Sequence, residues 1–433
     1  MFFKKPFVDK KKFTSINITS EPLYGLSKDI EYCKNCLMSN QRPNMCPEHF
    51  HTKEKAKSII KFTDGICDGC LLKDKKDNEI DWEERERELK VLLNKYRSNN
   101  GSYDVLLPGS GGKDSFYVAH ILKYKYGMNP LTCTFAPNIY TEWGLKNFYS
   151  WLEAGFNNYK FTVDIKVHKL ITRISLENLL HPFQPWILGQ KNFPTKFAKL
   201  TKIPLIFYGE NPAEYGNPND KYYDDMLMEW HACDNLDNVY IAGLPTSELS
   251  KKFKLVNSNL EPYLPLTYKE FKDNNLKCVA FSYFKKWHPQ ENYYYTVENS
   301  NFITSPERTA GTYSKYSSID DKIDDLHYYT AKIKFGIGRT HYDVAQEIRS
   351  GDLTTSEGKS LINKFDGEYP KRFEKEIFDY LSLDNEQYKD IQTEFEVLKM
   401  DRDYFDNLCD SFRSPHLWRF SNKGWSLRKT IDS

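Results

Sequence analysis

The hydrophobic pattern between residues 103 and 208 alternates between short apolar runs and longer amphipathic stretches. Short apolar runs bounded by turn residues are typical of buried strands, and apolar residues three and four apart are typical of helices. The pattern predicts strands at 103–108, 130–136, 160–164 and 203–208, and helices at 114–126, 142–155, 166–180 and near 195–200. Because strands alternate with helices, we expect an α/β fold built on a parallel sheet with right-handed crossovers.

The segments on either side of this region follow other patterns. Residues 77–97 carry an apolar stripe behind acidic first turns, which predicts a helix, and the polar residues 99–102 end it. Residues 278–284 have the pattern of one more buried strand, and residues 340–400 are mostly helical. Residues 354–357, Thr-Thr-Ser-Glu, form a capping-box sequence. We therefore divide the chain into a cysteine-rich N-terminal region (1–76), an α/β domain (77–300) and a mostly helical C-terminal region (301–433).

A glycine-rich turn joins the first predicted strand to the helix that follows it. Its residues, 109–115, are Gly-Ser-Gly-Gly-Lys-Asp-Ser. Backbone N–H groups freed by such a turn at the start of a helix form a site for phosphate. The order of residues is neither the Walker pattern nor the dinucleotide-binding pattern. An ordinary turn with a helix N-cap is the alternative interpretation.

The turn therefore predicts a nucleotide site in which each side chain has a distinct chemistry. Lys113 offers a positive charge for phosphates, and Asp114 is a candidate ligand for Mg²⁺. Gly209 and Glu210 follow the strand predicted at 203–208 and belong to the same edge of a parallel sheet, where ligands bind. The residues predicted to bind nucleotide are Ser110, Gly111, Gly112, Lys113, Asp114, Ser115, Gly209 and Glu210.

Two Cys-x-x-Cys pairs lie in the N-terminal region. Cys33 with Cys36 and Cys67 with Cys70 can present four thiolates to Zn²⁺, and a four-thiolate site is structural because it leaves no open position. Unrelated free cysteines, or an iron–sulfur cluster, are the alternatives. Three further residues with ligand chemistry lie between the pairs and are interpreted as loop residues: Cys46, His49 and His51.

A carboxylate-rich segment precedes the predicted C-terminal helices. If residues 318–327 are helical, Asp321, Asp324 and Asp325 share one face and could bind metal or a polar substrate. A solvated acidic helix face is the alternative. Arg308 and Arg339 flank the segment and could each clamp a carboxylate or phosphate with two hydrogen bonds.

Composition narrows the possible functions. The 433 residues carry a formal net charge of +1, which does not favour nucleic-acid binding. No apolar run reaches membrane-spanning length, and the start of the chain lacks the apolar segment of a signal peptide, so we expect a cytoplasmic protein.

No cysteine has the setting of a glutaminase nucleophile, either at the N-terminus or in a G-x-C-x-G turn. The chain is not expected to release ammonia from glutamine.

Together these motifs resemble the N-acetyl sugar amidotransferases of bacterial surface-glycan biosynthesis, which belong to the PP-loop ATP pyrophosphatases. The resemblance covers most of residues 31–370, whereas the tail after about 380 has no counterpart in it. Its motifs are the two cysteine pairs, Arg42-Pro43, and residues 110–115, 209–216, 308–318, 319–329 and 334–339.

The resemblance implies an enzyme with a Rossmann-like sheet that converts a sugar N-acetyl group to an acetamidino group and forms AMP and pyrophosphate. An amide carbonyl is resonance-stabilised and a poor electrophile. Transfer of AMP to its oxygen gives an O-adenylyl imidate that ammonia can attack. The implied catalytic residues are Lys113, Asp114 and Ser115, and the implied substrate contacts are Arg308, Thr312, Tyr313, Asp321, Asp324, His327 and Arg339.

The resemblance also implies partners. ATP, Mg²⁺ and a structural Zn²⁺ are the expected cofactors, and a nucleotide-activated N-acetyl sugar is the expected substrate. A class I glutaminase subunit of the HisH type would supply ammonia, with a HisF-like cyclase-type subunit as a further candidate. No membrane or nucleic-acid partner is expected. Two alternatives stay open: a tRNA-thiolating or lysidine-forming enzyme, which also joins such a loop to Cys-x-x-Cys pairs, and an inactive zinc-ribbon binding module.

Overall fold

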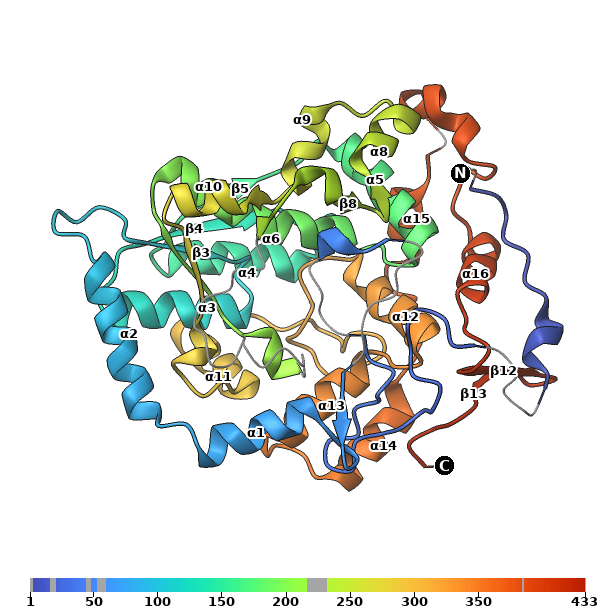
Figure 1. Ribbon diagram of the computed structural model, residues 1–433, viewed down its shortest axis with the longest axis horizontal. Helices are drawn as coiled ribbons and strands as arrows, with labels where there is room; N and C mark the ends of the chain where they lie inside the picture. Colours follow the sequence, from blue (N-terminus) through green and yellow to red (C-terminus); the bar gives the residue numbers. More distant parts are fainter. Residues whose placement is uncertain are drawn as a thin grey trace.

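A five-stranded parallel sheet forms the core of the α/β region, and its strands β3, β4 and β5 are labelled at the upper left of Figure 1. The structure is a computed structural model that describes residues 3–15, 21–43, 48–52, 60–215, 232–383 and 385–432. The strands are β3 (Val105–Pro108), β4 (Pro130–Phe135), β5 (Asn157–Phe161), β6 (Leu205–Tyr208) and β11 (Lys277–Ala280). Their order across the sheet is β11-β6-β3-β4-β5, so the chain winds outward from β3 in both directions. The predicted α/β fold with a parallel sheet is confirmed.

Helices cover both faces of the sheet. One face packs against α6 (Gln184–Thr201) and α10 (Tyr268–Asp273), and the other against α2 (Trp82–Tyr96), α3 (Lys113–His120) and α4 (Glu142–Glu153). Side chains of β3 alternate between these layers, because Val105 and Leu107 pack with α2 and α3 while Leu106 packs with α6. A strand buried on both faces is a continuous apolar run, which is why the pattern at 103–108 was informative.

Several predicted boundaries differ from the structure for identifiable reasons. The strand predicted at 160–164 is β5, which ends at Phe161 because Asp164 accepts the N–H groups of Lys166 and Val167 as the N-cap of α5 (Ile165–Leu179). The helix predicted at 77–97 is α2, which starts at Trp82, and a separate helix α1 (Asp68–Asn78) precedes it. The helix predicted near 195–200 is the end of the 18-residue α6.

The strand predicted at 278–284 ends early as well. β11 stops at Ala280, and Phe281–Tyr283 form a 3-10 turn. In this turn the N–H of Ser282 donates to the carbonyl of Gly209, and its hydroxyl accepts the N–H of Asn211. These bonds hold the loop after β6, so a tertiary contact overrides the strand pattern.

The C-terminal region is largely helical, and α5 anchors it. Its helices are α12 (Asp324–Phe335), α13 (Arg339–Ser350), α14 (Thr355–Phe365), α15 (Glu374–Leu381) and α16 (Arg402–Ser411) (Figure 1). The fully buried guanidinium of Arg173 on α5 donates to the carbonyls of Leu381, Val397 and Leu398. The capping box is confirmed, because Thr354 and Glu357 cap α14 reciprocally. A terminal hairpin, β12 (Trp418–Ser421) with β13 (Gly424–Leu427), was not predicted.

The cysteine-rich region packs against the C-terminal hairpin, so segments near the start and the end of the chain lie side by side. In Figure 1 the first 3-10 helix (Lys10–Phe13) lies next to β12. Apolar residues of the first 70 positions share one buried cluster with Phe335, Leu417 and Trp418. Nε2 of His416 lies 3.1 Å from Oε1 of Gln41 across the same contact. The proposed divisions at residues 76 and 300 stay a prediction. Among the described residues, no helix is long and apolar enough to cross a membrane.

Candidate functional site

One cavity of about 490 Å³ lies at the carboxyl ends of β3 and β6. These neighbouring strands are the point from which the chain winds in opposite directions, where ligands bind in open α/β sheets. The loop after β3 contributes Ser110, Gly112, Lys113 and Asp114 to the lining, and the loop after β6 contributes Glu210. The volume is in the range of small-molecule sites.

The glycine-rich loop packs closely on its surroundings. Gly111 has φ +89°, and a Cβ there would overlap the backbone carbonyl of Asn147 on α4. A Cβ at Gly109 would lie 2.5 Å from the Cβ of Ser115. No side chain of the described residues caps α3 at Gly112. The loop therefore presents an uncapped helix N-terminus at the cavity wall, an arrangement suited to an anion.

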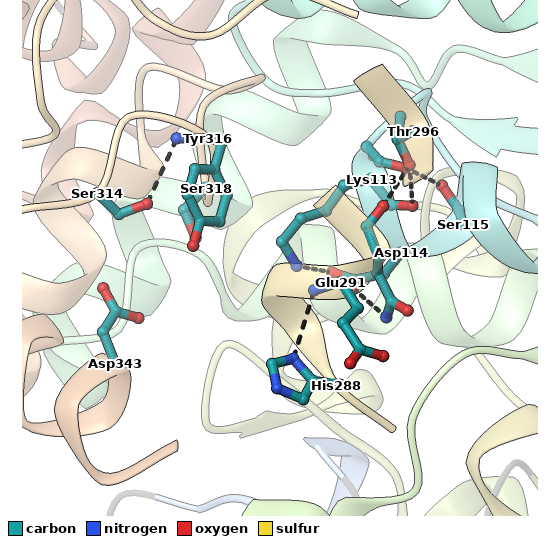
Figure 2. A network of polar contacts seen from close by, with 12 residues as sticks. Lys113, Asp114, Ser115, His288, Glu291, Thr296, Ser314, Tyr316, Ser318 and Asp343 are labelled. Atoms are coloured by element: carbon teal, nitrogen blue, oxygen red, sulfur yellow. Dashed lines mark hydrogen bonds and ion pairs between the residues drawn. The ribbon is translucent and has the colours of Figure 1, made fainter. Parts of the chain in front are cut away.

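Lys113 and Asp114 form a charged pair at this wall (Figure 2). Nζ of Lys113 lies 2.5 Å from Oδ2 of Asp114, and Asn292 donates from Nδ2 to Oδ1 of Asp114 at 3.2 Å. Thr296 donates to the carbonyl of Lys113 at 3.0 Å. Because Asn292 and Thr296 belong to α11 (Pro289–Asn299), that helix orients both residues of the pair. The pair offers a cation for phosphate and a carboxylate for Mg²⁺.

The opposite wall comes from the C-terminal region. Figure 2 shows Ser314, Tyr316, Ser318 and Asp343 across from Lys113 and Asp114. Helix α13 supplies five lining residues, and three of them follow one another at four-residue spacing: Arg339, Asp343 and Glu347. Nε of Arg339 donates to Oδ1 of Asp343 at 2.8 Å, and its NH1 donates to Oγ of Ser318 at 2.6 Å. The spacing places all three on one helix face, which the sequence pattern could have revealed.

Two residues predicted to bind substrate form hydrogen bonds to these carboxylates. Oγ1 of Thr312 donates to Asp343 at 2.5 Å, and the hydroxyl of Tyr313 donates to Glu347 at 2.7 Å. Neither Thr312 nor Tyr313 lines the cavity. Burial raises the pKa of the Glu347 carboxyl to about 7, although Tyr313 and the charge of Lys113 act in the other direction.

Three other predicted contacts lie outside the cavity lining. Arg308 makes a two-bond ion pair with Glu368 at 2.5 and 2.7 Å. Asp321 is buried and accepts N–H groups of Asn138 at 2.5 Å and Ile323 at 2.9 Å. Asp324 is the first residue of α12, and burial raises its pKa to about 7. Because α12 begins only at Asp324, Asp321 does not share its face, contrary to the helical prediction.

The remaining predicted site residues divide between the lining and the layer behind it. His327 and Arg339 line the cavity. Ser115 lies behind the loop, where its hydroxyl donates to the carbonyl of Gly112 at 3.0 Å. A Cβ at Gly209 would lie 2.9 Å from the Trp287 ring, so this glycine makes room for the indole. Asp320, Asp343 and Glu347 are lining residues that the sequence did not single out.

The four predicted metal ligands lie together in a buried cluster. The sulfur atoms of Cys33, Cys36, Cys67 and Cys70 all lie within 4.8 Å of one another. Two of the separations are 3.8 Å (Cys33–Cys70) and 3.5 Å (Cys36–Cys67). Four thiolates bound tetrahedrally to zinc at about 2.3 Å have sulfur–sulfur distances of about 3.8 Å. The cluster therefore fits Zn²⁺.

The surroundings of the cluster suit thiolate charge. The N–H of Cys67 donates to Sγ of Cys33 at 3.4 Å, and Arg349 donates from NH1 to Sγ of Cys36 at 3.4 Å. Arg349 also donates to the carbonyl of Glu214 at 3.2 Å, so it links the cluster to the loop after β6. Cys46, between the two pairs, lies outside the described residues, as does Gly216.

The C-terminal wall of the cavity is also the part of the chain with a family match. Residues 310–431 match the family model of the LPS biosynthesis protein WbpG-like C-terminal domain. The match includes Asp320, His327 and α13, and it continues through the tail that the resemblance left without a counterpart. It supports a role in lipopolysaccharide or glycan biosynthesis.

A second similarity covers a smaller part of a relative. The chain is 34% identical over 96 residues to the uncharacterized protein MJ1599 of Methanocaldococcus jannaschii. The aligned part is 22% of this chain and 33% of that protein. The chain thus spans about a third of the length of this curated relative.

Proposed function

We propose that the protein is an ATP-dependent amidotransferase that forms AMP and pyrophosphate. It would convert the N-acetyl group of a nucleotide-activated sugar to an acetamidino group for lipopolysaccharide or a related glycan. One observation carries the proposal: the glycine-rich loop after β3 and the region that matches the WbpG-like domain line the same cavity. The hydrogen bond from Ser110 to Asp320 joins the two directly.

The loop residues suit the nucleotide. The uncapped start of α3 and the Lys113 ammonium would bind phosphate oxygens, as in a Rossmann-like PP-loop enzyme, and Lys113 would stabilise charge that develops on the leaving pyrophosphate. Asp114 would hold Mg²⁺ through oxygen. The acceptor sugar would then lie toward His327, Arg339 and Asp343, so that its acetamido oxygen meets the α-phosphate.

Ammonia would come from a separate glutaminase subunit. Burial raises the pKa of the Cys133, Cys278 and Cys409 thiols, so these cysteines do not suit nucleophilic attack on glutamine. The four clustered cysteines would serve Zn²⁺ as a structural site. The proposal therefore predicts activity with ammonium salts alone, and activity with glutamine only when the partner is present.

The test measures nucleotide products and acceptor mass. The protein is incubated with ATP, Mg²⁺, ammonium and a panel of nucleotide-activated N-acetyl sugars. The mass of the product should show that NH replaces the acetyl oxygen, and one AMP should be released for each sugar converted. Formation of ADP instead of AMP would falsify the proposal. Release of AMP that depends on bulk tRNA instead of sugar would favour the tRNA-modifying alternative.

A pair of lysine variants assigns the activity to the loop. Lys113→Ala should abolish AMP release and leave zinc content unchanged, because Lys113 lines the cavity. Lys146→Ala is the control, since this lysine lies on the surface of α4 and pairs with Glu142. Equal activity of both variants would contradict the assignment.

A further inference from the structure

A second polar cluster lines the same cavity and contains no residue of the glycine-rich loop. It consists of Glu48, His51, His181 and His327. Nδ1 of His51 lies 2.8 Å from Oε2 of Glu48, and Nε2 of His181 lies 3.8 Å from the same oxygen. The rings of His181 and His327 stack with centroids 4.7 Å apart. Three distant segments of the chain thus bring one carboxylate and three imidazoles together.

The cluster is buried and supported from behind. The side chains of Glu48 and His51 are only 9% and 6% exposed. Gln184 on α6, itself fully buried, donates to the carbonyl of Glu48 and accepts the N–H of Ala242. Holding a carboxylate away from water costs free energy, so a carboxylate fixed at a cavity wall is suited to a polar or cationic ligand.

The proposed reaction needs such a ligand. At neutral pH ammonia is mostly the ammonium ion, which has no lone pair and cannot attack carbon. A site for the nitrogen substrate must therefore attract a small cation and then accept a proton from it. A carboxylate beside an imidazole has both properties.

We propose that Glu48 binds ammonium and that His181 accepts its proton. This inference rests on the proposed amidotransferase function. Oε2 of Glu48 and Nε2 of His181 are 3.8 Å apart, so one ammonium nitrogen could lie about 2.9 Å from both atoms. His51 holds the carboxylate in place, and His327 supports the His181 ring by stacking.

The proton and electron balance is complete. One N–H bond of ammonium breaks, its proton goes to the imidazole of His181, and the electron pair stays on nitrogen. That pair forms the C–N bond to the adenylated amide carbon. A second proton passes from the attacking nitrogen to the sugar nitrogen of the neutral imidate. The C–O bond to AMP then breaks, AMP leaves with the electron pair, and the product is the amidinium. The proton returns to solvent before the next turnover.

Two cations in the same lining contact protein groups. Lys334 donates from Nζ to the carbonyl of Leu179 at 2.7 Å, and the Arg42 guanidinium lies 4.8 Å from the centre of the Tyr342 ring.

The experiment compares two amines in three variants. Rates of AMP formation are measured at saturating ATP and sugar while ammonium, or hydroxylamine, is varied. Glu48→Gln and His181→Asn should lower kcat/KM for ammonium by about 10²-fold, the size of a general-base effect, with KM for ATP unchanged. Hydroxylamine is mostly unprotonated at neutral pH and should restore both variants to near wild-type rates.

His49→Asn is the matched control. His49 is as buried as Glu48 and His51, but it is not part of the cavity lining. This variant should keep the ammonium dependence of the wild type. Unchanged ammonium dependence in Glu48→Gln and His181→Asn, or equal losses with both amines, would overturn the inference. A wild-type protein that forms no AMP with any amine would overturn the proposed function together with it.

Discussion

Ser110 donates a hydrogen bond of 2.7 Å to Oδ2 of Asp320, a residue 210 positions later in the chain. The bond joins the glycine-rich loop to the C-terminal wall of the cavity. Next to it, Asp321 accepts backbone N–H groups of Asn138 and Ile139, which follow β4. Two loops at the carboxyl edge of the sheet are thus held by consecutive aspartates of one segment.

We expect Ser110→Ala to weaken ATP binding. A hydrogen bond to a charged group contributes about 1.5–3 kcal/mol, and its loss frees the loop from the opposite wall. KM for ATP should rise about tenfold, measured by AMP formation. Ser360→Ala on α14 removes an exposed hydroxyl and should change nothing. An unchanged KM in Ser110→Ala would show that the loop holds its shape without Asp320.

Gly111→Ala should be more harmful than an alanine at another glycine with the same backbone conformation. Gly111 and Gly351 both have φ +89°, which costs an alanine about 1 kcal/mol. A Cβ at Gly351 would contact nothing within 4 Å, whereas one at Gly111 would overlap the carbonyl of Asn147. Chemical denaturation should show the larger loss of stability for Gly111→Ala, with loss of AMP release in that variant alone. Equal losses would contradict the close packing of the loop.

Cys36→Ser should remove the bound metal and destabilise the N-terminal region. Its sulfur lies 3.5 Å from that of Cys67, and binding of a structural zinc contributes directly to folding free energy. Protein from zinc-supplemented medium should contain one zinc per chain, measured by elemental analysis, and the variant much less. Cys233→Ser is the control, because Cys233 is buried in β7 (Ala232–Cys233) and not in the cluster. Full zinc content in Cys36→Ser would contradict the four-cysteine site.

Glu347 should make stability fall as pH rises toward neutrality. Burial raises its pKa to about 7 in the folded protein, against about 4.3 in an unfolded chain. Between these values the folded state binds more protons, so the stabilisation is complete below about pH 4.3 and is lost as pH rises through 7. Glu347→Gln should therefore gain stability relative to the wild type between pH 5 and pH 8. Urea denaturation at these two pH values measures the difference.

A surface glutamate is the control for the general effect of removing one carboxylate on the pH dependence of stability. Glu83→Gln on α2 changes an exposed side chain and should show the same pH trend as the wild type. Asp321 and Asp324, whose pKa values burial also raises to about 7, stay in both proteins and cancel from the comparison. A pH trend in Glu347→Gln identical to that of the wild type would contradict the raised pKa.

Local patterns predicted the features that depend on neighbours in sequence. The run 103–108 and the glycines after it indicated a strand, a turn and a helix, and these are β3, the loop and α3. Spacing of two residues within each cysteine pair indicated the cluster that the structure contains. The capping box at Thr354 was predicted for the same reason, since its hydrogen bonds join residues three apart.

Contacts between distant residues were the source of two differences. The pattern at 278–284 predicts a strand. Ser282 forms hydrogen bonds with the loop after β6, and the strand ends before it in a 3-10 turn. The clustered aspartates at 320–325 predict one helix face. Asp321 instead accepts a hydrogen bond from the loop after β4, and α12 begins only at Asp324. In both places hydrogen bonds to a remote backbone outweigh a local preference.

The order of residues alone therefore established the α/β class, the glycine-rich loop after the first strand and the paired cysteines, because hydrophobic period and short spacing act within a few residues. The tertiary structure determined which groups share a cavity. Asp343 and Glu347 line it together with Lys113, whereas Arg308 and Asp321 lie outside the lining. Glu48 and His181, far apart in the sequence, are in contact. No local rule contains that information, since such proximity follows from strand order and from the packing of segments hundreds of residues apart.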